Sequence, residues 1–209
     1  MSLKLLLLVL TGLFWSIAYF DIIRVGLKQK TYGMPFLALS LNLTWELYNT
    51  VQGFLMVGFH IANTINLIWV VMDLMILYTY FKYGNSHLKI KPLLFYLGSI
   101  FIILVSFLLQ YWIGEEKGLV LGAVYSAFWS NLLMSLLFIP LYYKRKNLLG
   151  QTLLIAYTKC LGTLAITILV GIIGINSLGG KISSITYIGG LTFIVDVWYI
   201  YLVHKRVKA

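Results

Sequence analysis

The chain has 209 residues, of which 61% are hydrophobic and 11% are charged, and its formal net charge is +10. The apolar residues form long blocks and the mean hydropathy is +0.92, which excludes an ordinary soluble domain. Inside a bilayer, backbone groups must be satisfied within each segment, so blocks of about 20 apolar residues indicate helices. The sequence therefore predicts an all-α integral membrane protein, and its length favours a single domain over residues 1–209 with no soluble appendage.

Seven blocks are long enough to span a bilayer. In chain order they cover residues 3–23, 34–57, 62–81, 92–113, 119–141, 151–173 and 184–203. The first block begins like a signal peptide, but no small-residue cleavage site follows it, and Trp15, Tyr19 and Asp21 continue it. We therefore expect a true first helix and a seven-transmembrane helix bundle.

Basic residues gather at alternate ends of these blocks, in the first, third and fifth loops and in the tail. They are Arg24, Lys28, Lys30, Lys82, Lys89, Lys91, Lys144, Arg145, Lys146, Lys205, Arg206 and Lys208. The opposite ends hold only Lys4, Lys117 and Lys181. The positive-inside rule then predicts the N-terminus outside and the C-terminus in the cytoplasm. The positive net charge thus indicates contact with anionic headgroups rather than with nucleic acid.

Four charged residues lie well inside the predicted spans: Glu46, Asp73, Lys159 and Asp196. A charge at mid-bilayer costs at least about 2.5–3.5 kcal/mol on insertion scales, so such residues are usually functional. At 1.5 Å per residue, Asp73, Lys159 and Asp196 lie roughly 13–15 Å from the cytoplasmic ends of their spans, and Glu46 roughly 17–18 Å. The four charges are therefore predicted to share one layer.

Each carboxylate has polar or aromatic neighbours at helical spacing. These rows are Asn42, Trp45, Glu46, Asn49 and Gly53 on the second span, Asn66, Trp69, Asp73 and Tyr80 on the third, and Gly189, Thr192, Asp196 and Tyr199 on the seventh. One interpretation is structural: interhelical hydrogen bonds and one Lys159–Asp196 ion pair would hold the bundle together. The other is chemical, because buried neighbouring carboxyl groups can keep a proton and act as general acids. Aromatic ring faces stabilise cations, so such a pocket suits a carbocation cyclisation.

Two further residues have simpler interpretations. Asp21 lies near Arg24 at the predicted membrane face, where we expect a surface ion pair. Cys160 is the single cysteine and lies inside a span, so it excludes a disulfide framework. With no histidine nearby in sequence, Cys160 is interpreted as a packing residue rather than a nucleophile.

Residues 31–46, TYGMPFLALSLNLTWE, resemble the TYGMP…AL…N…WE hallmark of the membrane-bound terpene cyclases. This family includes paxilline-type and fungal meroterpenoid cyclases and their bacterial relatives. The matched positions are Tyr32, Gly33, Met34, Pro35, Ala38, Leu39, Asn42, Trp45 and Glu46. Two later runs are similar to further family blocks; they contain Trp69, Asp73, Tyr78, Lys82, Tyr83 and Gly84, and then Tyr187, Gly189, Gly190, Phe193, Asp196 and Tyr199. The middle spans carry no matching motif.

The resemblance implies a seven-helix enzyme that protonates the terminal alkene or epoxide of a prenylated substrate. The polyene would then cyclise through carbocations, a protonation-initiated intramolecular reaction of the isomerase or lyase type. The family's two essential acids fall on Glu46 and Asp196, and we expect Asp73 to support them. The side chains expected to contact the substrate are Asn42, Trp45, Asn49, Trp69, Lys159 and Tyr199.

Neither DDxxD nor DxDD occurs in the chain, which agrees with a mechanism that uses no metal and no cofactor. The expected partners are a lipophilic prenylated small molecule and the lipid bilayer. The composition is rich in isoleucine and lysine, which favours a multi-pass protein of a bacterial cytoplasmic membrane.

The alternative is a proton-coupled small-molecule transporter of a seven-helix type. Intramembrane carboxylates favour it, and so does a run of Asp, Tyr and Lys at identical spacing that begins at Asp73 and again at Asp196. Against it, the chain has no Pro-Gln dipeptide of the PQ-loop kind. A retinal protein fits less well, because the core lysine, Lys159, lies on the sixth span and not on the last.

Overall fold

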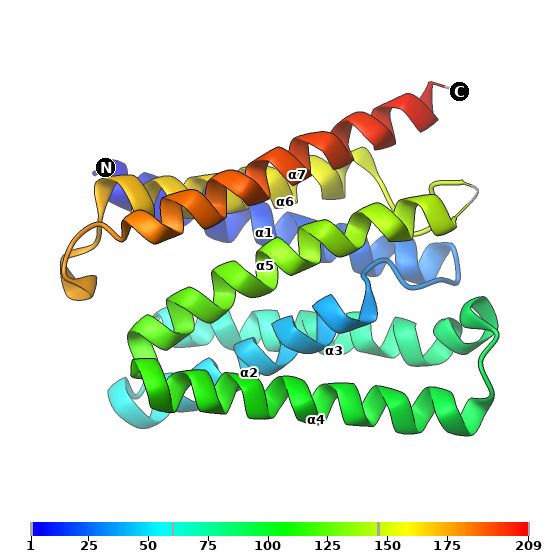
Figure 1. The fold of residues 1–209 in the computed structure, drawn as a ribbon, viewed down its shortest axis with the longest axis horizontal. Helices are drawn as coiled ribbons and strands as arrows, with labels where there is room; N and C mark the ends of the chain where they lie inside the picture. Colours follow the sequence, from blue (N-terminus) through cyan, green and yellow to red (C-terminus); the bar gives the residue numbers. More distant parts are fainter. Residues whose placement is uncertain (1, 60, 146, 209) are drawn as a thin grey trace.

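The computed structural model describes residues 2–59, 61–145 and 147–208, without the side chains of residues 61 and 62. Lys146, predicted to lie in a basic loop, is outside the described residues. In this part of the chain, consecutive α-helices run in opposite directions (Figure 1). They are α1 (Leu3–Lys28), α2 (Phe36–Val57), α3 (Ile61–Leu88), α4 (Pro92–Lys117), α5 (Leu119–Lys144), α6 (Leu153–Thr167) and α7 (Ser183–Val207). A π-helical turn, η1 (Ile168–Ile173), continues α6, and a short 3₁₀ turn, η2 (Asn176–Leu178), precedes α7.

Each predicted span coincides with one of these helices, and α6 together with η1 fills the sixth. Within the described residues, six helices are long and apolar enough to cross a membrane. The helix outside this set is α2, because amide, hydroxyl and carboxyl side chains interrupt its apolar residues. The all-helical membrane class is therefore confirmed.

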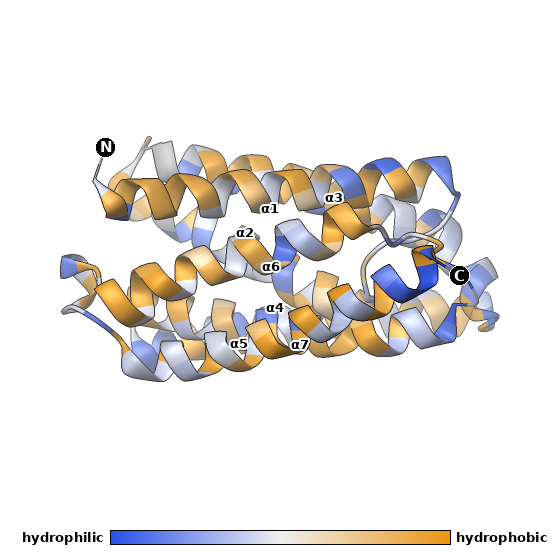
Figure 2. Ribbon diagram, turned by 90° about the horizontal axis from the view of Figure 1, so that it is seen from above, coloured by the Kyte–Doolittle hydropathy of each residue, from blue (hydrophilic) through white to orange (hydrophobic). Residues whose placement is uncertain are grey.

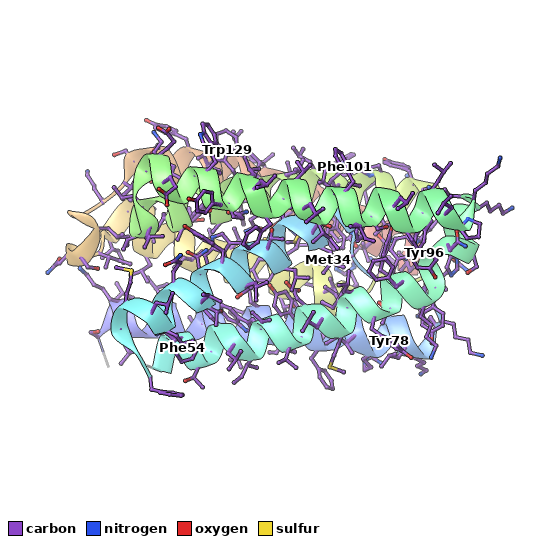
Figure 3. All side chains as sticks on the ribbon, turned by 90° about the horizontal axis from the view of Figure 1, so that it is seen from below. Met34, Phe54, Tyr78, Tyr96, Phe101 and Trp129 are labelled. Carbon is purple, nitrogen blue, oxygen red and sulfur yellow. The ribbon has the colours of Figure 1, made fainter. Side chains whose placement is uncertain are left out.

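The outer surface of the bundle is apolar and aromatic, as contact with lipid requires. Figure 3 shows Tyr78, Phe101 and Trp129 projecting outward, and more than half of each side chain is exposed. Met34 lies between the helices and is fully buried. Large apolar side chains are thus exposed on the outer surface, which agrees with a membrane-embedded protein.

The positions of the basic residues differ in part from the prediction. Helices α1, α3, α5 and α7 continue past the predicted ends of their spans, so several cations lie in helices rather than in loops. The last helical turns contain Lys28 in α1, Lys144 in α5 and Lys205 in α7. Cations are favoured at helix C-termini, where they complement the helix dipole, and the helices therefore extend into the polar end of the bundle. Figure 2 shows hydrophilic residues gathered at this end, near the C-terminus.

Six helices form a closed ring. In order around it, α1 contacts α6, α6 contacts α7, α7 contacts α5, α5 contacts α2, α2 contacts α3, and α3 contacts α1. Helix α4 lies outside the ring against α2 and α5. Figure 1 shows α1, α6 and α7 together on one side and α4 on the other, with α5 between them and α2 overlapping α3 in this view.

The loop between α1 and α2 closes the basic end of the ring. The Arg145 guanidinium donates a hydrogen bond to the carbonyl of Tyr32 at 2.6 Å and lies 4.5 Å from the centre of its ring. Gly150 has a φ of 73° and approaches the Tyr32 carbonyl too closely for a side chain. Met34 and, on the first turn of α2, Ala38 and Leu39 belong to a large buried core cluster. The loop at residues 31–35 is therefore tightly packed against the start of α2 and the segment between α5 and α6.

Close contact between α6 and α7 depends on a glycine. A Cβ atom at Gly189 would overlap the buried Thr167 side chain, whereas a Cβ at the neighbouring Gly190 would meet no atom within 4 Å. Small residues of this kind let membrane helices approach closely enough to pack backbone against side chain.

We predict that Gly189→Ala lowers the free energy of unfolding by about 1–3 kcal/mol, because the added methyl group must displace α7 from α6. Gly190→Ala is the matched control, and we expect no loss of stability there, since alanine is the better helix former. Thermal unfolding in detergent would compare the two. Equal stability of both variants would contradict this account of the α6–α7 interface.

Candidate functional site

A cavity of about 230 Å³ lies inside the helix ring. It is lined by Leu8, Thr11, Trp15, Tyr19, Asn42, Trp45, Glu46, Trp69, Ala127, Phe128, Ser130, Asn131 and Ile166, which come from α1, α2, α3, α5 and α6. Most of this wall is apolar or aromatic, and Glu46 supplies its carboxyl group. An apolar cavity with a few convergent polar groups is the usual form of a small-molecule site.

The aromatic walls are fixed by hydrogen bonds at their edges. Trp45 Nε1 donates to the Ala123 carbonyl at 2.9 Å, and Trp69 Nε1 donates to Ser16 Oγ at 3.0 Å. Because each indole N–H group is hydrogen-bonded to a neighbouring helix, the orientation of the ring is fixed and its face is available to a ligand. Tyr19 packs edge-to-face against Trp69, with ring centroids 6.3 Å apart. Such rigid ring faces can stabilise a positive charge without having to reorganise.

A buried polar network joins α1, α2 and α3 at the wall. Asn42 Nδ2 donates to Tyr19 Oη at 2.6 Å and to Asp73 Oδ2 at 2.7 Å. Tyr19 Oη in turn donates to Glu46 Oε1 at 3.3 Å. Glu46 is 2% exposed and Asp73 is fully buried. The network therefore connects two carboxyl groups through a phenol and an amide.

This network contains no cation. The two ion pairs within the described residues join Arg24 to Asp21 and Lys159 to Asp196, so neither Glu46 nor Asp73 has one there. Glu46 Oε2 and Asp73 Oδ1 are also buried and have no hydrogen-bond partner among the described groups. Burying two unpaired carboxylates side by side would be costly, and a proton held on the network removes that cost. A carboxyl group that holds a proton in a dry cavity can act as a general acid.

A second charged group lies on the other side of the ring. Lys159 Nζ donates to Asp196 Oδ1 and to Ser135 Oγ, which confirms the predicted Lys159–Asp196 ion pair. Ser135 Oγ donates to the backbone carbonyl of Asn131 at 3.0 Å, one helical turn away on α5. Asn131 lines the cavity, whereas Lys159 and Asp196 do not. The ion pair thus lies off the cavity wall and is linked to it through one turn of α5.

The predicted site residues divide between the wall and its surroundings. Four of them, Asn42, Trp45, Glu46 and Trp69, line the cavity, and Asp73 contacts it through Asn42. Asn49 lies off the wall and donates to the Trp45 carbonyl at 2.9 Å. Tyr199 is fully buried in the packed end and donates to Gln151 Oε1 at 3.0 Å. Substrate contact by Asn49, Lys159 and Tyr199 stays a prediction.

Sequence reasoning missed the contribution of α1. Thr11, Trp15 and Tyr19 line the cavity and recur every four residues, so they lie on one helix face. This spacing was a usable signal, but the apolar residues around it concealed it. Phe128 and Asn131 on α5 were missed in the same way, although Asn131 is a polar residue well inside a span.

The structure corrects the expectation for Asp21. Its ion pair with Arg24 is present, with Arg24 Nη2 2.6 Å from Asp21 Oδ1. The pair is not a surface pair, because the Asp21 side chain is only 1% exposed and Thr152 also donates to it. Thr152 caps the start of α6, so Asp21 joins α1 to α6 in the core. Cys160 is buried, in agreement with a packing role.

The fold and the cavity define a helical membrane protein with an acid-bearing aromatic site. Residues 1–203 match the family model of Pyr4-like transmembrane terpene cyclases, and the chain belongs to this family. The resemblance inferred from residues 31–46 is therefore confirmed. Membership gives no support to the transporter alternative. No solved structure matches the chain.

Several curated relatives are fungal terpene cyclases. Terpene cyclase ascF of Acremonium egyptiacum is 31% identical over 115 residues, which cover 51% of this chain and 41% of the relative. Pyr4-family terpene cyclase mfmH of Annulohypoxylon moriforme is 29% identical over 75% of this chain and 65% of its own length. Terpene cyclase macJ of Penicillium terrestre is 26% identical over 75% of this chain and 62% of its own length. The chain thus spans less than two thirds of each of these relatives.

We predict that Lys159→Met lowers the free energy of unfolding by about 3–5 kcal/mol, because it leaves the Asp196 carboxylate buried without its partner. The double variant Lys159→Met/Asp196→Asn removes both charges and should recover most of the loss. Thermal unfolding in detergent would measure both variants. A double variant no more stable than the single one would contradict the ion pair.

Proposed function

We propose that this chain is a membrane-embedded terpene cyclase that acts on a lipophilic prenylated substrate. The observation that carries the proposal is the position of Glu46, a carboxyl group on the wall of an aromatic cavity with no cation paired to it among the described residues. Family membership supports the same reaction class. The relatives described above are terpene cyclases by name, which supports the same class.

In the proposed reaction, Glu46 transfers its proton to the terminal alkene or epoxide of the prenyl chain. With an alkene, the π electron pair forms the new C–H bond; with an epoxide, the oxygen takes the proton as its C–O bond opens. Successive double bonds then attack the cation and close the rings. The ring faces of Trp15, Trp45 and Trp69 would stabilise the charge as it moves. The last cation loses one proton, and in the proposed cycle the Glu46 carboxylate regains one, so the overall reaction is an isomerisation.

We assign a supporting role to Asp73, whereas Asp196 is proposed to share the acid chemistry with Glu46. Asp73 is linked to Glu46 through Asn42 and Tyr19, so its negative charge would influence how firmly the network holds its proton. Asp196 does not line the cavity. Lys159 and Ser135 connect it by hydrogen bonds to Asn131, which does. The participation of Asp196 in the acid chemistry is what the family resemblance implies.

We predict that Glu46→Gln lowers turnover by about 10²–10⁴-fold, because the amide keeps the shape of the side chain but has no transferable proton. Glu116→Gln is the matched control, since Glu116 is exposed at the end of α4. Asp73→Asn should cause a smaller loss. Turnover of an epoxidised or plain farnesylated acceptor would be measured together with thermal stability. Normal cyclisation by a folded Glu46→Gln variant would refute the assignment.

The role of Asp196 needs a charge-balanced background, because Asp196→Asn alone leaves the Lys159 cation unpaired. In the Lys159→Met/Asp196→Asn variant, the acid role implied by the family resemblance gives the same loss of about 10²–10⁴-fold. If this variant folds and cyclises its substrate normally, the carboxylate is structural.

We also propose that the reaction needs no metal, because the sequence contains neither acidic motif of the soluble terpene cyclases. Turnover should therefore be unchanged by EDTA. The control is the same assay with added magnesium after dialysis. Loss of turnover on chelation and its recovery with magnesium would point instead to a diphosphate-ionising mechanism.

We propose that all seven helices span the membrane, with the N-terminus outside and the C-terminus in the cytoplasm. Basic residues at the ends of α1, α5 and α7 support this orientation. The composition also leads us to propose a bacterial cytoplasmic membrane, which the fungal relatives do not support. Reporter fusions at both termini should give a cytoplasmic signal only at the C-terminus. A cytoplasmic signal from the N-terminal fusion would reverse the orientation.

A further inference from the structure

In the structure, the hydrogen bonds around Tyr19 run in one direction, from Asn42 through Tyr19 to Glu46. The Asn42 amide nitrogen carries two hydrogens, and it lies 2.6 Å from Tyr19 Oη and 2.7 Å from Asp73 Oδ2. Each hydrogen is therefore donated to one of these oxygens. Since Tyr19 Oη accepts from Asn42, its own hydrogen is left to be donated to Glu46 Oε1 at 3.3 Å.

The opposite arrangement would leave a buried donor unpaired. If Glu46 carried its proton on Oε1, that proton would be directed at Tyr19 Oη, which already accepts from Asn42. The phenol hydrogen would then have no acceptor within the residues that the structure describes. A proton on Oε2 also has no acceptor among the described groups, so both arrangements contain one unpaired buried donor. Only with the proton on Oε2 is that unpaired donor the acidic hydrogen itself, which a bound substrate can accept.

We propose that Tyr19 fixes the acidic proton of Glu46 on Oε2, and that Tyr19 is a positioning residue for the proton transfer. Oε2 is the buried oxygen of this carboxyl group that makes no hydrogen bond to any described residue, so no described group competes with a substrate for its proton. Oε1 is held as the carbonyl oxygen by the Tyr19 hydroxyl. The inference rests on the proposed cyclase function for its catalytic consequence only; the position of the proton is independent of it.

The same bond should become stronger during the reaction. When the Oε2–H bond breaks and the proton bonds to the substrate, negative charge develops over both oxygens of Glu46. A hydrogen bond to an ionised acceptor is roughly twice as strong as one to a neutral acceptor. The bond from Tyr19 therefore stabilises the transition state more than the ground state, which is the condition for an effect on rate.

Asn42 fixes the direction of the hydrogen bonds between Asp73, Tyr19 and Glu46. Its amide group lies between Tyr19 and Asp73, so both of its hydrogens are committed and it cannot turn without losing a bond. Edge-to-face packing of the Tyr19 ring against Trp15 and Trp69, with centroids 5.8 and 6.3 Å apart, limits the movement of the phenol. The hydroxyl group is therefore held in place from two sides.

The kinetic test compares Tyr19→Phe with Tyr80→Phe, which removes another buried phenol hydroxyl, one that accepts from Ser99 at 3.4 Å and lies off the cavity wall. Tyr19→Phe should lower kcat on the order of 10²-fold with KM unchanged. In a Glu46→Gln background the same substitution should cause no further loss, because the proton that Tyr19 positions is absent. Equal kcat values for the two Tyr→Phe variants, with an active wild type, would overturn the role of Tyr19.

An infrared test needs no substrate. The difference spectrum between the wild type and Glu46→Gln should contain the C=O stretching band of a protonated carboxylic acid. In Tyr19→Phe this band should move to higher wavenumber, because the carbonyl oxygen Oε1 loses its donor, whereas Tyr80→Phe should leave it in place. Absence of the band, or an unchanged band in Tyr19→Phe, would overturn the proton position. A shifted band in a protein that cyclises no substrate would retain the inference and refute the proposed function.

Discussion

The constraint on which the site depends is the unequal pairing of charges inside the bundle. Asp196 is paired with Lys159, whereas Glu46 and Asp73 share a buried network that holds no cation among the described residues. A dry carboxylate without a counter-ion is costly, so this network is suited to holding a proton. The aromatic wall beside it offers ring faces to a cation. Acid and cation-stabilising surface thus meet in one cavity.

The remainder of the bundle keeps that cavity rigid. At the basic end, the loop at residues 31–35 is packed beneath Arg145, and Asp21 joins α1 to α6 through Thr152. On the other side, Gly162 allows α6 to lie directly against Trp15, where any larger residue would displace the indole. Glu46 itself makes none of these contacts, yet they fix the helices from which the wall is built. A preorganised site of this kind stabilises charge without reorganisation during the reaction.

The sequence was sufficient for the helices, because a bilayer imposes one length and one composition on every span. It was also sufficient for the Lys159–Asp196 pair, which the similar depth of the two charges suggested. It could not show that Glu46 lines the cavity and that Asp196 does not, because the order of helices around the ring is not encoded in local spacing. Tyr19 was missed for a related reason. A tyrosine in an apolar block has no distinguishing local pattern, and its role follows only from its hydrogen bonds to Asn42 and Glu46 on α2.

The most direct test of the central claim is conversion of a prenylated substrate by the purified protein in liposomes. Epoxidised and plain farnesylated acceptors would be supplied on one side, and mass spectrometry with NMR would follow both their chemistry and their side of the bilayer. The account predicts a cyclic product with the same molecular mass as its substrate. Substrate that crosses the bilayer unchanged, or that stays unchanged where it was added, would contradict it.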